Sequence, residues 1–381
     1  MKKNFVVAID SFKGSLSSME AGHIVEKAIE DTFDNASVKV FPLADGGEGT
    51  VDALADGLGG SIVLTEVTGP LGEKVQSRYG WLPELKLAII EMADAAGLPM
   101  VPKEKRNPMN TTTYGLGELM LQAAEHGARE FIIGIGGSAT NDAGLGMLTA
   151  LGVRFTNAEG APVGIYGRDL TDVASIDVSG LADCIKESRI HVACDVTNPL
   201  CGENGCSVVY GPQKGATPEI VRSMDSAIHH FALLGESMLG FTGAETPGAG
   251  AAGGLGYAYA AYLGAELKPG ISLVLDALDI ESSLKEADVL ITGEGRMDRQ
   301  TAMGKGPAGV AQLAKKLSGA LTIAFCGCAS DDAEMVNDSG IDAYFPILHH
   351  AGTAEEAMEP DVARSNLYRT AVQVFRLMKS Q

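Results

Sequence analysis

Hydrophobic positions along the chain fall into short apolar runs that alternate with amphipathic stretches, which predicts a protein of mixed strands and helices. Near the N-terminus we expect strands over 5–10 and 38–44, each followed by a helix, over about 18–33 and 48–58. This order is typical of a parallel sheet covered by helices. At the start of the first helix, Ser17 and Glu20 have the spacing of a capping box, in which the glutamate reaches back to the serine.

The same pattern returns at the other end of the chain. Strands are expected over 287–295, 320–329 and 343–348, a helix over 306–317, and an amphipathic helix over 354–379. The two ends together therefore predict one α/β domain with a parallel sheet.

The middle of the chain has a different pattern. Residues 61–92 resemble antiparallel strands joined by Gly/Pro turns, and further strands are expected over 130–135 and 189–196. A helix is expected with Leu116, Leu119, Met120 and Ala123 on one face, and a long helix over 217–240. We interpret the chain as a discontinuous Rossmann-like domain, residues 1–64 and 286–381, with an inserted mixed α/β domain, residues 65–285. The active site is expected in a cleft between them, because ligands favour domain interfaces.

Composition narrows the class of protein. The net charge of −20 disfavours nucleic acid and anionic membranes as partners, because both would repel the chain. No apolar run approaches the length of a membrane-spanning helix, and the N-terminus lacks the features of a signal peptide. A chain of 381 residues can bury a large core without disulfides, so we expect a cytoplasmic protein with reduced thiols.

Glycine is unusually frequent, with 48 residues, and it is clustered. Nearly half of the glycines fall in five stretches: 44–50, 134–146, 202–215, 248–256 and 293–309. Such clusters mark loops where the backbone must approach something closely. Four of the five carry acidic residues near expected strand ends, whereas 248–256 has no charged residue and no chemical interpretation at this stage.

Polar side chains follow the first two expected strands. Ser11 and Lys13 follow the first, where an open α/β sheet binds ligands, although Lys13 could equally be an ordinary solvated residue of a turn. Asp45 and Glu48 follow the second, around two glycines. Two carboxylates there suit Mg²⁺ or substrate hydroxyls. The competing interpretation is a helix cap with a glutamate in the first turn.

The loop GIGGSATNDAGLG (134–146) follows a strand and opens a helix, so its main-chain N–H groups would form a nest for phosphates. The candidate residues are Gly136, Gly137, Ser138, Thr140 and Asp142. Gly134 to Ala139 also match a dinucleotide fingerprint, which leaves a dinucleotide-dependent oxidoreductase as an alternative. The acidic residue expected about 20 positions later is not convincingly present, which argues against it.

Two further stretches carry acidic residues at strand ends. Asp195 ends a buried-type strand and is followed by Thr197 and Asn198. Glu294 and Asp298 lie in TGEGRMDRQTAMGKG, which lacks the spacing of a P-loop. Carboxylates with glycine nests and a few cations fit Mg-dependent phosphoryl transfer, in which a protein mainly positions groups and neutralises charge. A non-catalytic ligand-binding protein is the other alternative, and the retained carboxylates argue against it.

Taken together, these stretches resemble the type I glycerate kinase family. The resemblance covers nearly the whole chain, in the family's order, and rests on DSFKGSLS, PLADGGEGT, EMADAAGL, RNPMNTTTYGLGEL, GIGGSATNDAG, ACDVTNPLCGENG, VYGPQKGA, PGAGAAGGLG and TGEGRMDRQT with GKGP. It implies two domains and ATP-dependent phosphorylation of D-glycerate with Mg²⁺. The family's usual product is 2-phosphoglycerate, and phosphorylation at the 3-hydroxyl stays open.

For this activity we assign roles to the candidate residues from their positions along the chain. Asp195 is expected as the general base, with Lys13 and Ser11 at the glycerate carboxylate or the transferring phosphate. Asp45, Glu48 and Asn198 are assigned to the substrate, and Gly136, Gly137, Ser138, Thr140 and Asp142 to the ATP phosphates. Glu294 and Asp298 are the metal candidates. The partners are small molecules, and a homo-oligomer is left open.

Overall fold

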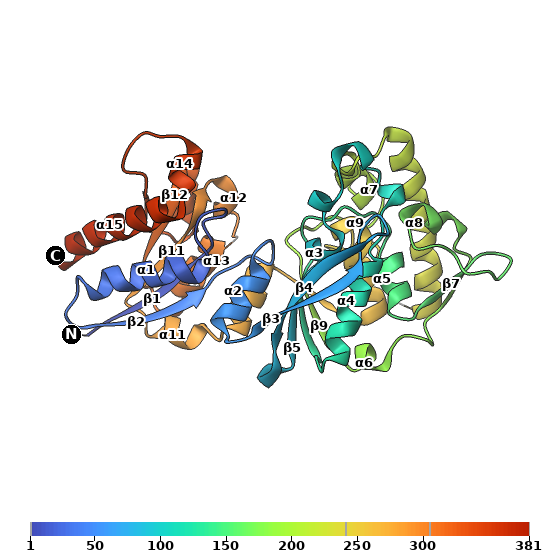
Figure 1. Cartoon of the computed structure of the whole chain (residues 1–381), viewed down its shortest axis with the longest axis horizontal. Coiled ribbons are helices and arrows are strands. Elements are labelled where there is room, and N and C mark those ends of the chain that lie inside the picture. Colours follow the sequence, from blue (N-terminus) through green and yellow to red (C-terminus); the bar gives the residue numbers. More distant parts are fainter. Residues whose placement is uncertain (1, 241, 305, 381) are drawn as a thin grey trace. The chain divides into compact units, whose positions relative to one another are not determined.

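The computed structural model describes residues 2–240, 242–304 and 306–380 (Figure 1). The chain divides into two compact units, which are described separately. Unit 1 consists of Met1–Asp45, Asp52–Gly59 and Ile271–Gln381, and unit 2 of Gly46–Val51 and Gly60–Gly270.

The boundaries of the units differ from the predicted domain boundaries, which were drawn between 64 and 65 and between 285 and 286. Strand β3 (Ser61–Thr68) belongs to unit 2, because it pairs along its whole length with β4 (Lys74–Leu82). Helix α11 (Glu281–Lys285) belongs to unit 1, where it packs against α13 (Gly306–Leu317).

Unit 1 contains a five-stranded sheet in the order β13-β12-β11-β1-β2, with every neighbouring pair parallel. This confirms the parallel sheet built from both chain ends. Its strands are β1 (Lys3–Ile9), β2 (Ala36–Pro42), β11 (Val289–Met297), β12 (Leu321–Ala329) and β13 (Ala343–Pro346).

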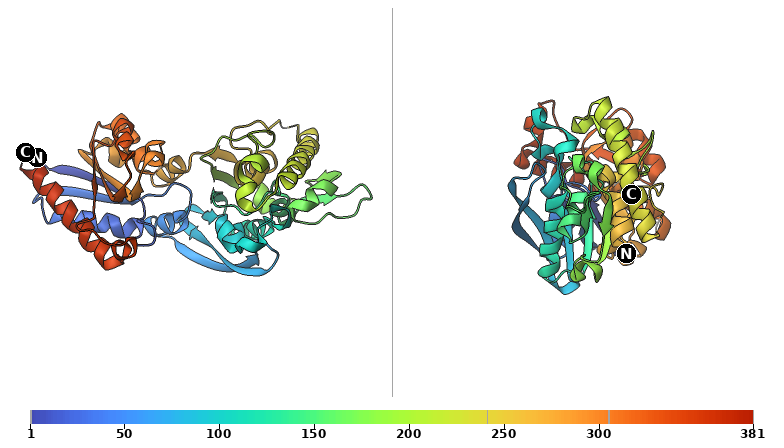
Figure 2. Two further views of the ribbon diagram at one scale, coloured as in Figure 1. Left: turned by 90° about the horizontal axis from the view of Figure 1, so that it is seen from above. Right: turned by 90° about the vertical axis from the view of Figure 1, so that its right-hand side faces the viewer.

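Helices cover both faces of this sheet. Helices α1 (Ser18–Glu30) and α15 (Pro360–Lys379) lie side by side on one face (Figures 1 and 2). There they enclose a core that includes Phe5, Phe325 and Phe375. The other face carries α13, which contacts β1, β11 and β12. The remaining helices of this unit are α10 (Gly270–Ala277, whose first residue belongs to unit 2), α12 (Arg299–Ala302), α14 (Ala354–Met358) and most of α2 (Thr50–Gly57).

Two details of unit 1 correct the sequence analysis. The single helix predicted over 354–379 is two helices, α14 and α15, because Pro360 starts a new helix and cannot donate a hydrogen bond to the preceding turn. At the start of α1, Ser17 caps the helix by accepting from the Glu20 amide as predicted. The Glu20 carboxylate does not reach back, however; it accepts a hydrogen bond from Arg364 of α15 instead.

Unit 2 is built on a six-stranded mixed sheet in the order β10-β9-β6-β5-β4-β3. The pairs β3–β4 and β4–β5 are antiparallel, which confirms the prediction for residues 61–92, and the remaining pairs are parallel. The other strands are β5 (Leu87–Glu91), β6 (Glu130–Gly134), β9 (Arg189–Ala193) and β10 (Glu266–Lys268). A separate two-stranded antiparallel sheet consists of β7 (Arg154–Thr156) and β8 (Ser175–Asp177).

The main helices of unit 2 agree with the hydrophobic pattern. The predicted apolar face of α4 (Tyr114–Glu125) is buried, and α8 (Pro218–Leu239) is the long helix expected over 217–240. The unit also contains α3 (Ala93–Ala96), α5 (Leu145–Ala150), α6 (Asp183–Lys186), α7 (Cys206–Tyr210) and α9 (Ala251–Leu263).

The glycine run 248–256 has a structural explanation. It leads into α9 and lies directly against the loop that follows β6, where the Ala143 amide donates to the Gly253 carbonyl at 2.9 Å. Gly253 has φ +70°, and a Cβ atom there would lie 2.2 Å from the Thr140 carbonyl oxygen. At Gly256 the same atom would lie 2.0 Å from the Gly248 oxygen. These glycines allow two stretches of backbone to touch, which no side chain would permit.

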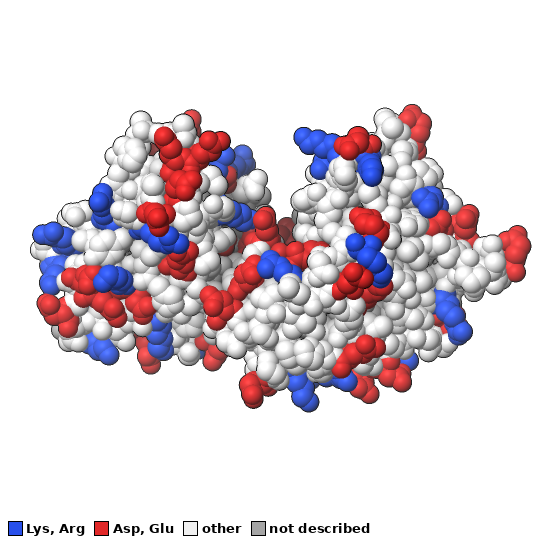
Figure 3. Space-filling model, in the orientation of Figure 1, with Lys and Arg blue, Asp and Glu red and all other residues white. Residues whose placement is uncertain are grey.

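The surface carries both signs of charge. On the face drawn in Figure 3, acidic and basic side chains are interspersed over each unit. Among the described residues, no helix is both long and apolar enough to cross a membrane.

Candidate functional site

In unit 1, the connections that leave the neighbouring strands β1 and β11 run in opposite directions along the sheet. From β1 the chain continues to β2 on one side, and from β11 it continues to β12 on the other. Open α/β sheets bind ligands at such a point, outside the carboxyl ends of the strands. Asp10 directly follows β1, and Glu294 lies near the end of β11.

The carboxyl groups at this point perturb one another. The pKa of Asp10 is raised to about 7, chiefly by burial and also by the nearby charge of Asp45, against the opposing effect of the Ser11 amide, which donates to Asp10 Oδ1 at 2.6 Å. Burial likewise raises the pKa of Glu294 to about 7, with the charges of Asp10, Asp298 and Asp45 adding to the effect. Such a cluster is suited to holding a shared proton or a cation. Asp10 follows the same buried strand as Ser11 and Lys13, and only the fold shows that it faces Glu294.

Asp298, a predicted metal ligand, acts as a helix cap. Its carboxylate accepts from the Gln300 amide at 2.8 Å at the start of α12, and the Thr301 hydroxyl closes a capping box. The same hydroxyl donates to Glu294 Oε1 at 2.5 Å, so the cap also orients Glu294. Lys305, which the sequence places in this turn, lies outside the described residues.

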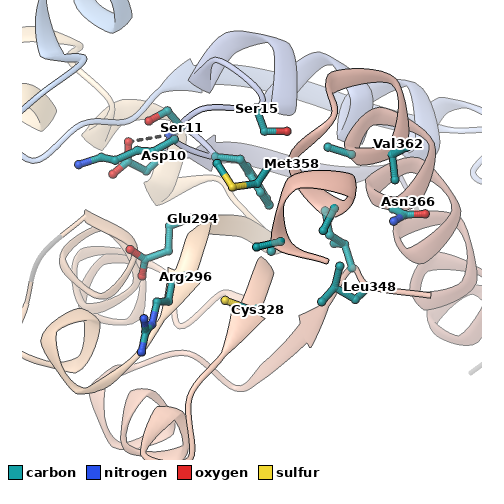
Figure 4. Close-up of a pocket in the computed structure, with 18 of the residues that line it drawn as sticks. Asp10, Ser11, Ser15, Glu294, Arg296, Cys328, Leu348, Met358, Val362 and Asn366 are labelled. Atoms are coloured by element: carbon teal, nitrogen blue, oxygen red, sulfur yellow. Dashed lines mark hydrogen bonds between the residues drawn. The ribbon is translucent and has the colours of Figure 1, made fainter. Parts of the chain in front are cut away.

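The carboxyl groups line a pocket of about 650 Å³ within unit 1. Figure 4 shows Asp10, Ser11, Glu294 and Arg296 toward one end of it, and Leu348, Val362 and Asn366 toward the other. Lys13 and Ser11 both line the pocket, as their predicted contact with a ligand requires. In the part of the chain that the structure describes, no three His, Cys, Asp or Glu side chains are already arranged to hold a metal ion.

In unit 2, the turn after β2 lies against the carboxyl ends of two parallel strands. A Cβ atom on Gly46 would lie 2.4 Å from the Ala193 Cβ atom, at the end of β9. The Glu91 carboxylate, at the end of β5, accepts from the amides of Gly49 and Val51 at 3.0 and 2.9 Å. The sequence analysis assigned no role to Glu91, although this residue ends an apolar run and begins the stretch EMADAAGL.

Three predicted residues of unit 2 differ in their surroundings. Asp195 is exposed just beyond β9, and its Oδ1 accepts from the Gly270 amide at 3.0 Å. Glu48 is also exposed. The side chain of Asn198 accepts from Tyr210 Oη at 2.6 Å and donates to a main-chain carbonyl at 2.9 Å, so it holds its own loop together.

The loop after β6 is largely turned inward. Asp142 is fully buried, where it accepts from the Thr113 amide and hydroxyl, both at 2.8 Å, and from the Gly144 amide at 3.1 Å. Ser138 and Thr140 are buried as well, and the Ser138 hydroxyl bonds within the loop. These three side chains therefore fix the loop, whereas Gly136 and Gly137 are exposed.

A lysine that the sequence analysis missed holds this loop in place by hydrogen bonds. Lys214 is only 2% exposed, and its Nζ donates to the Thr140 carbonyl at 2.5 Å and to Ser138 Oγ at 3.2 Å. Burial lowers the pKa of Lys214 to about 8, although Cys206 and Asp142 oppose the shift. Nothing in the local sequence, a glycine turn before α8, distinguishes this lysine from a solvated one.

Comparison with known proteins decides the family. The model of the glycerate kinase family matches residues 5–379. The chain belongs to the glycerate kinase family. It is 47% identical to a glycerate kinase of Haemophilus influenzae, over 98% of each chain, and 48% identical to glycerate 2-kinase of Escherichia coli K12, over 92% of each. A crystal structure of a Salmonella typhimurium LT2 protein assigned as glycerate kinase 2 superposes with a TM-score of 0.92, at 44% identity, covering 100% of this chain and 99% of the other.

The chain is therefore an enzyme and a kinase, and a glycerate kinase by family. A kinase has little covalent chemistry to perform itself; it positions two substrates and neutralises the charge on the transferring phosphoryl group. The described residues include groups of the kind that this task needs: carboxyl groups at the switch point of unit 1, an exposed carboxylate beyond β9, and exposed loop glycines.

Proposed function

We propose that this enzyme transfers the γ-phosphoryl group of ATP to the 2-hydroxyl of D-glycerate, with Mg²⁺ as the cofactor. The observation that carries the proposal is the group formed by Asp10 and Glu294 at the switch point of a parallel sheet, where both residues line a pocket of about 650 Å³. The names of the relatives support glycerate as the acceptor, and the name of the Escherichia coli relative supports its 2-hydroxyl.

The donor set in unit 1 fits Mg²⁺. This ion prefers oxygen ligands and is usually held by one or two carboxylates together with substrate phosphates, so a complete cage of protein ligands is not required. Asp10 and Glu294 would provide the carboxylates, and burial and neighbouring carboxylates raise the pKa of each, an environment in which a bound cation would favour the charged forms. When bound there, the ion would neutralise charge on the donor phosphates. We assign Asp10, Glu294 and the nearby Asp45 to this role, and Asp298 to holding the turn.

We propose Asp195 as the general base that accepts the proton of the glycerate hydroxyl. A base of this kind must be accessible and held in place. Asp195 is exposed at the carboxyl end of β9, and the hydrogen bond from the Gly270 amide fixes one of its oxygens. In this position its carboxylate would accept the substrate proton.

Anionic groups of the substrates need donors. We assign Lys13 and Ser11 in unit 1, and the main chain of Gly136 and Gly137 in unit 2, to the glycerate carboxylate or the phosphates. Glu48 is exposed and is assigned to a substrate hydroxyl.

The test is an assay of ADP release with D-glycerate and Mg-ATP, followed by phosphorus NMR of the product. We expect 2-phosphoglycerate; 3-phosphoglycerate would move the reaction to the other hydroxyl, and no turnover would refute the proposal. For the base, Asp195→Asn should lower kcat by about 10²–10⁴-fold with substrate binding intact. The matched control is Glu159→Gln, which neutralises an exposed carboxylate of the same unit in the β7–β8 turn. Turnover of Asp195→Asn within a few-fold of wild type would exclude Asp195 as the base.

A further inference from the structure

The pocket of unit 1 is larger than the groups assigned to it so far can use. Asp10, Glu294, Ser11 and Arg296 lie toward one end, whereas the pocket continues toward Met358 of α14 and Asn366 of α15 (Figure 4). A volume of about 650 Å³ is in the range of sites that enclose drug-sized ligands. A three-carbon acid would leave most of it empty.

Several large apolar side chains line this second part, alongside polar residues such as Thr353 and Glu356. Leu348, which follows β13, and Met358, at the end of α14, line the pocket although they are 48% and 45% exposed. Phe12 and Val362 line it as well. Large apolar side chains that face one cavity from separate elements are typical of a site for a flat or apolar ligand group.

Two polar groups in the same pocket lack partners. The Asn366 side chain of α15 is 6% exposed and lines the pocket, yet it makes no hydrogen bond with any residue that the structure describes. The Ser15 hydroxyl is buried and also has no partner among the described residues. Buried polar groups are nearly always hydrogen-bonded, so the buried Ser15 hydroxyl and the Asn366 amide beside the same cavity can both pair with a ligand that enters it.

We infer that this part of the pocket binds the adenine ring of the phosphate donor, an inference that rests on the proposed function. The Asn366 amide presents one donor and one acceptor side by side, which matches the N6 donor and N7 acceptor of adenine. Guanine presents two acceptors on the same edge, so it matches less well. Leu348 and Met358 provide the apolar contact for the ring.

The rest of the pocket suits the rest of a nucleotide. Its other end carries Lys13 and Arg296 as cations, together with the carboxyl groups assigned to Mg²⁺. A ligand with a planar base at one end and phosphates at the other therefore satisfies both ends, whereas glycerate would satisfy only one.

The first experiment measures binding of Mg-ADP by calorimetry and the KM for ATP, in wild type and Asn366→Ala. We expect a loss of ADP affinity and a rise in the KM for ATP of about 10-fold, the lower part of the range for a bidentate base contact. The KM for D-glycerate should not change, and the preference for ATP over GTP should fall. The matched control is Gln373→Ala, which removes an exposed amide from the same helix.

A second variant keeps the test valid if Asn366→Ala fails to fold. Ser15→Ala removes an unpartnered hydroxyl, so it should leave thermal stability unchanged and weaken Mg-ADP binding several-fold. Wild-type ADP affinity in both variants would overturn the inference, as would a change confined to the KM for D-glycerate. Calorimetry with Mg-ADP does not depend on the acceptor. If wild type binds ADP through Asn366 but fails to phosphorylate glycerate, the proposed acceptor is wrong and the adenine site stands.

Discussion

The contact between the glycine run and the loop after β6 gives a sharp prediction for Gly253→Ala. The residue has φ +70°, where an L-amino acid costs about 1–2 kcal/mol. In addition, the new Cβ atom would lie 2.2 Å from the Thr140 oxygen and 2.7 Å from the Asn141 Cα atom. Both are backbone atoms of a buried loop, so relief requires the loop to move, and overpacking of this kind costs about 1–3 kcal/mol.

Gly264→Ala is the matched control. Gly264 ends the same helix with φ +61°, and a Cβ atom there would meet nothing within 4 Å. It should therefore cost only the conformational part, about 1–2 kcal/mol, against about 2–5 kcal/mol for Gly253→Ala. Ala252 already has φ +52° in the native chain, which shows that the left-handed conformation alone is tolerated there.

Urea unfolding measured by the fluorescence of Trp81, the single tryptophan of the chain, isolates unit 2. The displacement of the loop in Gly253→Ala should also lower kcat, because this loop carries Gly136 and Gly137. Equal shifts of the unfolding midpoint in the two variants would show that the two backbones are not in close contact, and the reasoning would fail.

The remaining predictions concern titratable groups. The folded-state pKa of Glu294, about 7, lies above its ordinary value of 4.5, so the stability that its protonated form contributes is lost as the pH rises through this range. At pH 8 in EDTA, Glu294→Gln should therefore raise the free energy of unfolding by up to roughly 3 kcal/mol. In the activity assay with Mg-ATP, the same variant should lose turnover. An unchanged unfolding midpoint would contradict this. The pKa of Lys214 is lowered from 10.5 in the unfolded chain to about 8 in the folded protein, so the unfolded chain binds this proton more tightly. Between about pH 8 and 10.5, the stability of the wild type should therefore rise relative to that of Lys214→Met, by up to roughly 3 kcal/mol in urea titrations. A parallel pH dependence in both proteins would mean that Lys214 is not buried as an ammonium. Asp142→Asn should lose about 2–4 kcal/mol in urea unfolding, because the Thr113 and Gly144 amides donate to different oxygens of Asp142 and an amide NH₂ would replace one of these acceptors. Wild-type stability would contradict its role in fixing the loop.

The secondary structure could largely be predicted because hydrophobic period and turn residues are local signals. The errors arose where a distant residue decides the outcome: Glu20 binds Arg364 of α15 rather than its own helix cap. The candidate site was harder to predict from the sequence for the same reason. Nothing in the sequence around Lys214 or Asn366 indicates that each is buried, and nothing around Asp142 indicates that it faces inward. Strand-end acidic residues such as Glu294 could be found because parallel strands place their carboxyl ends at one edge.

The position of β1 in the sheet of unit 1 affects how the protein is made. On the ribosome, β1 can pair with β2 at once, but its other edge pairs with β11, where Phe5 lies beside Val289. That edge therefore stays open until most of the chain has been synthesised, and Phe375 must still arrive to cover the core around Phe5. Unit 2 is complete at Gly270 and can fold first. During this interval the nascent chain exposes an unpaired apolar strand, so its yield should depend on chaperones and on translation rate more than its final stability would suggest.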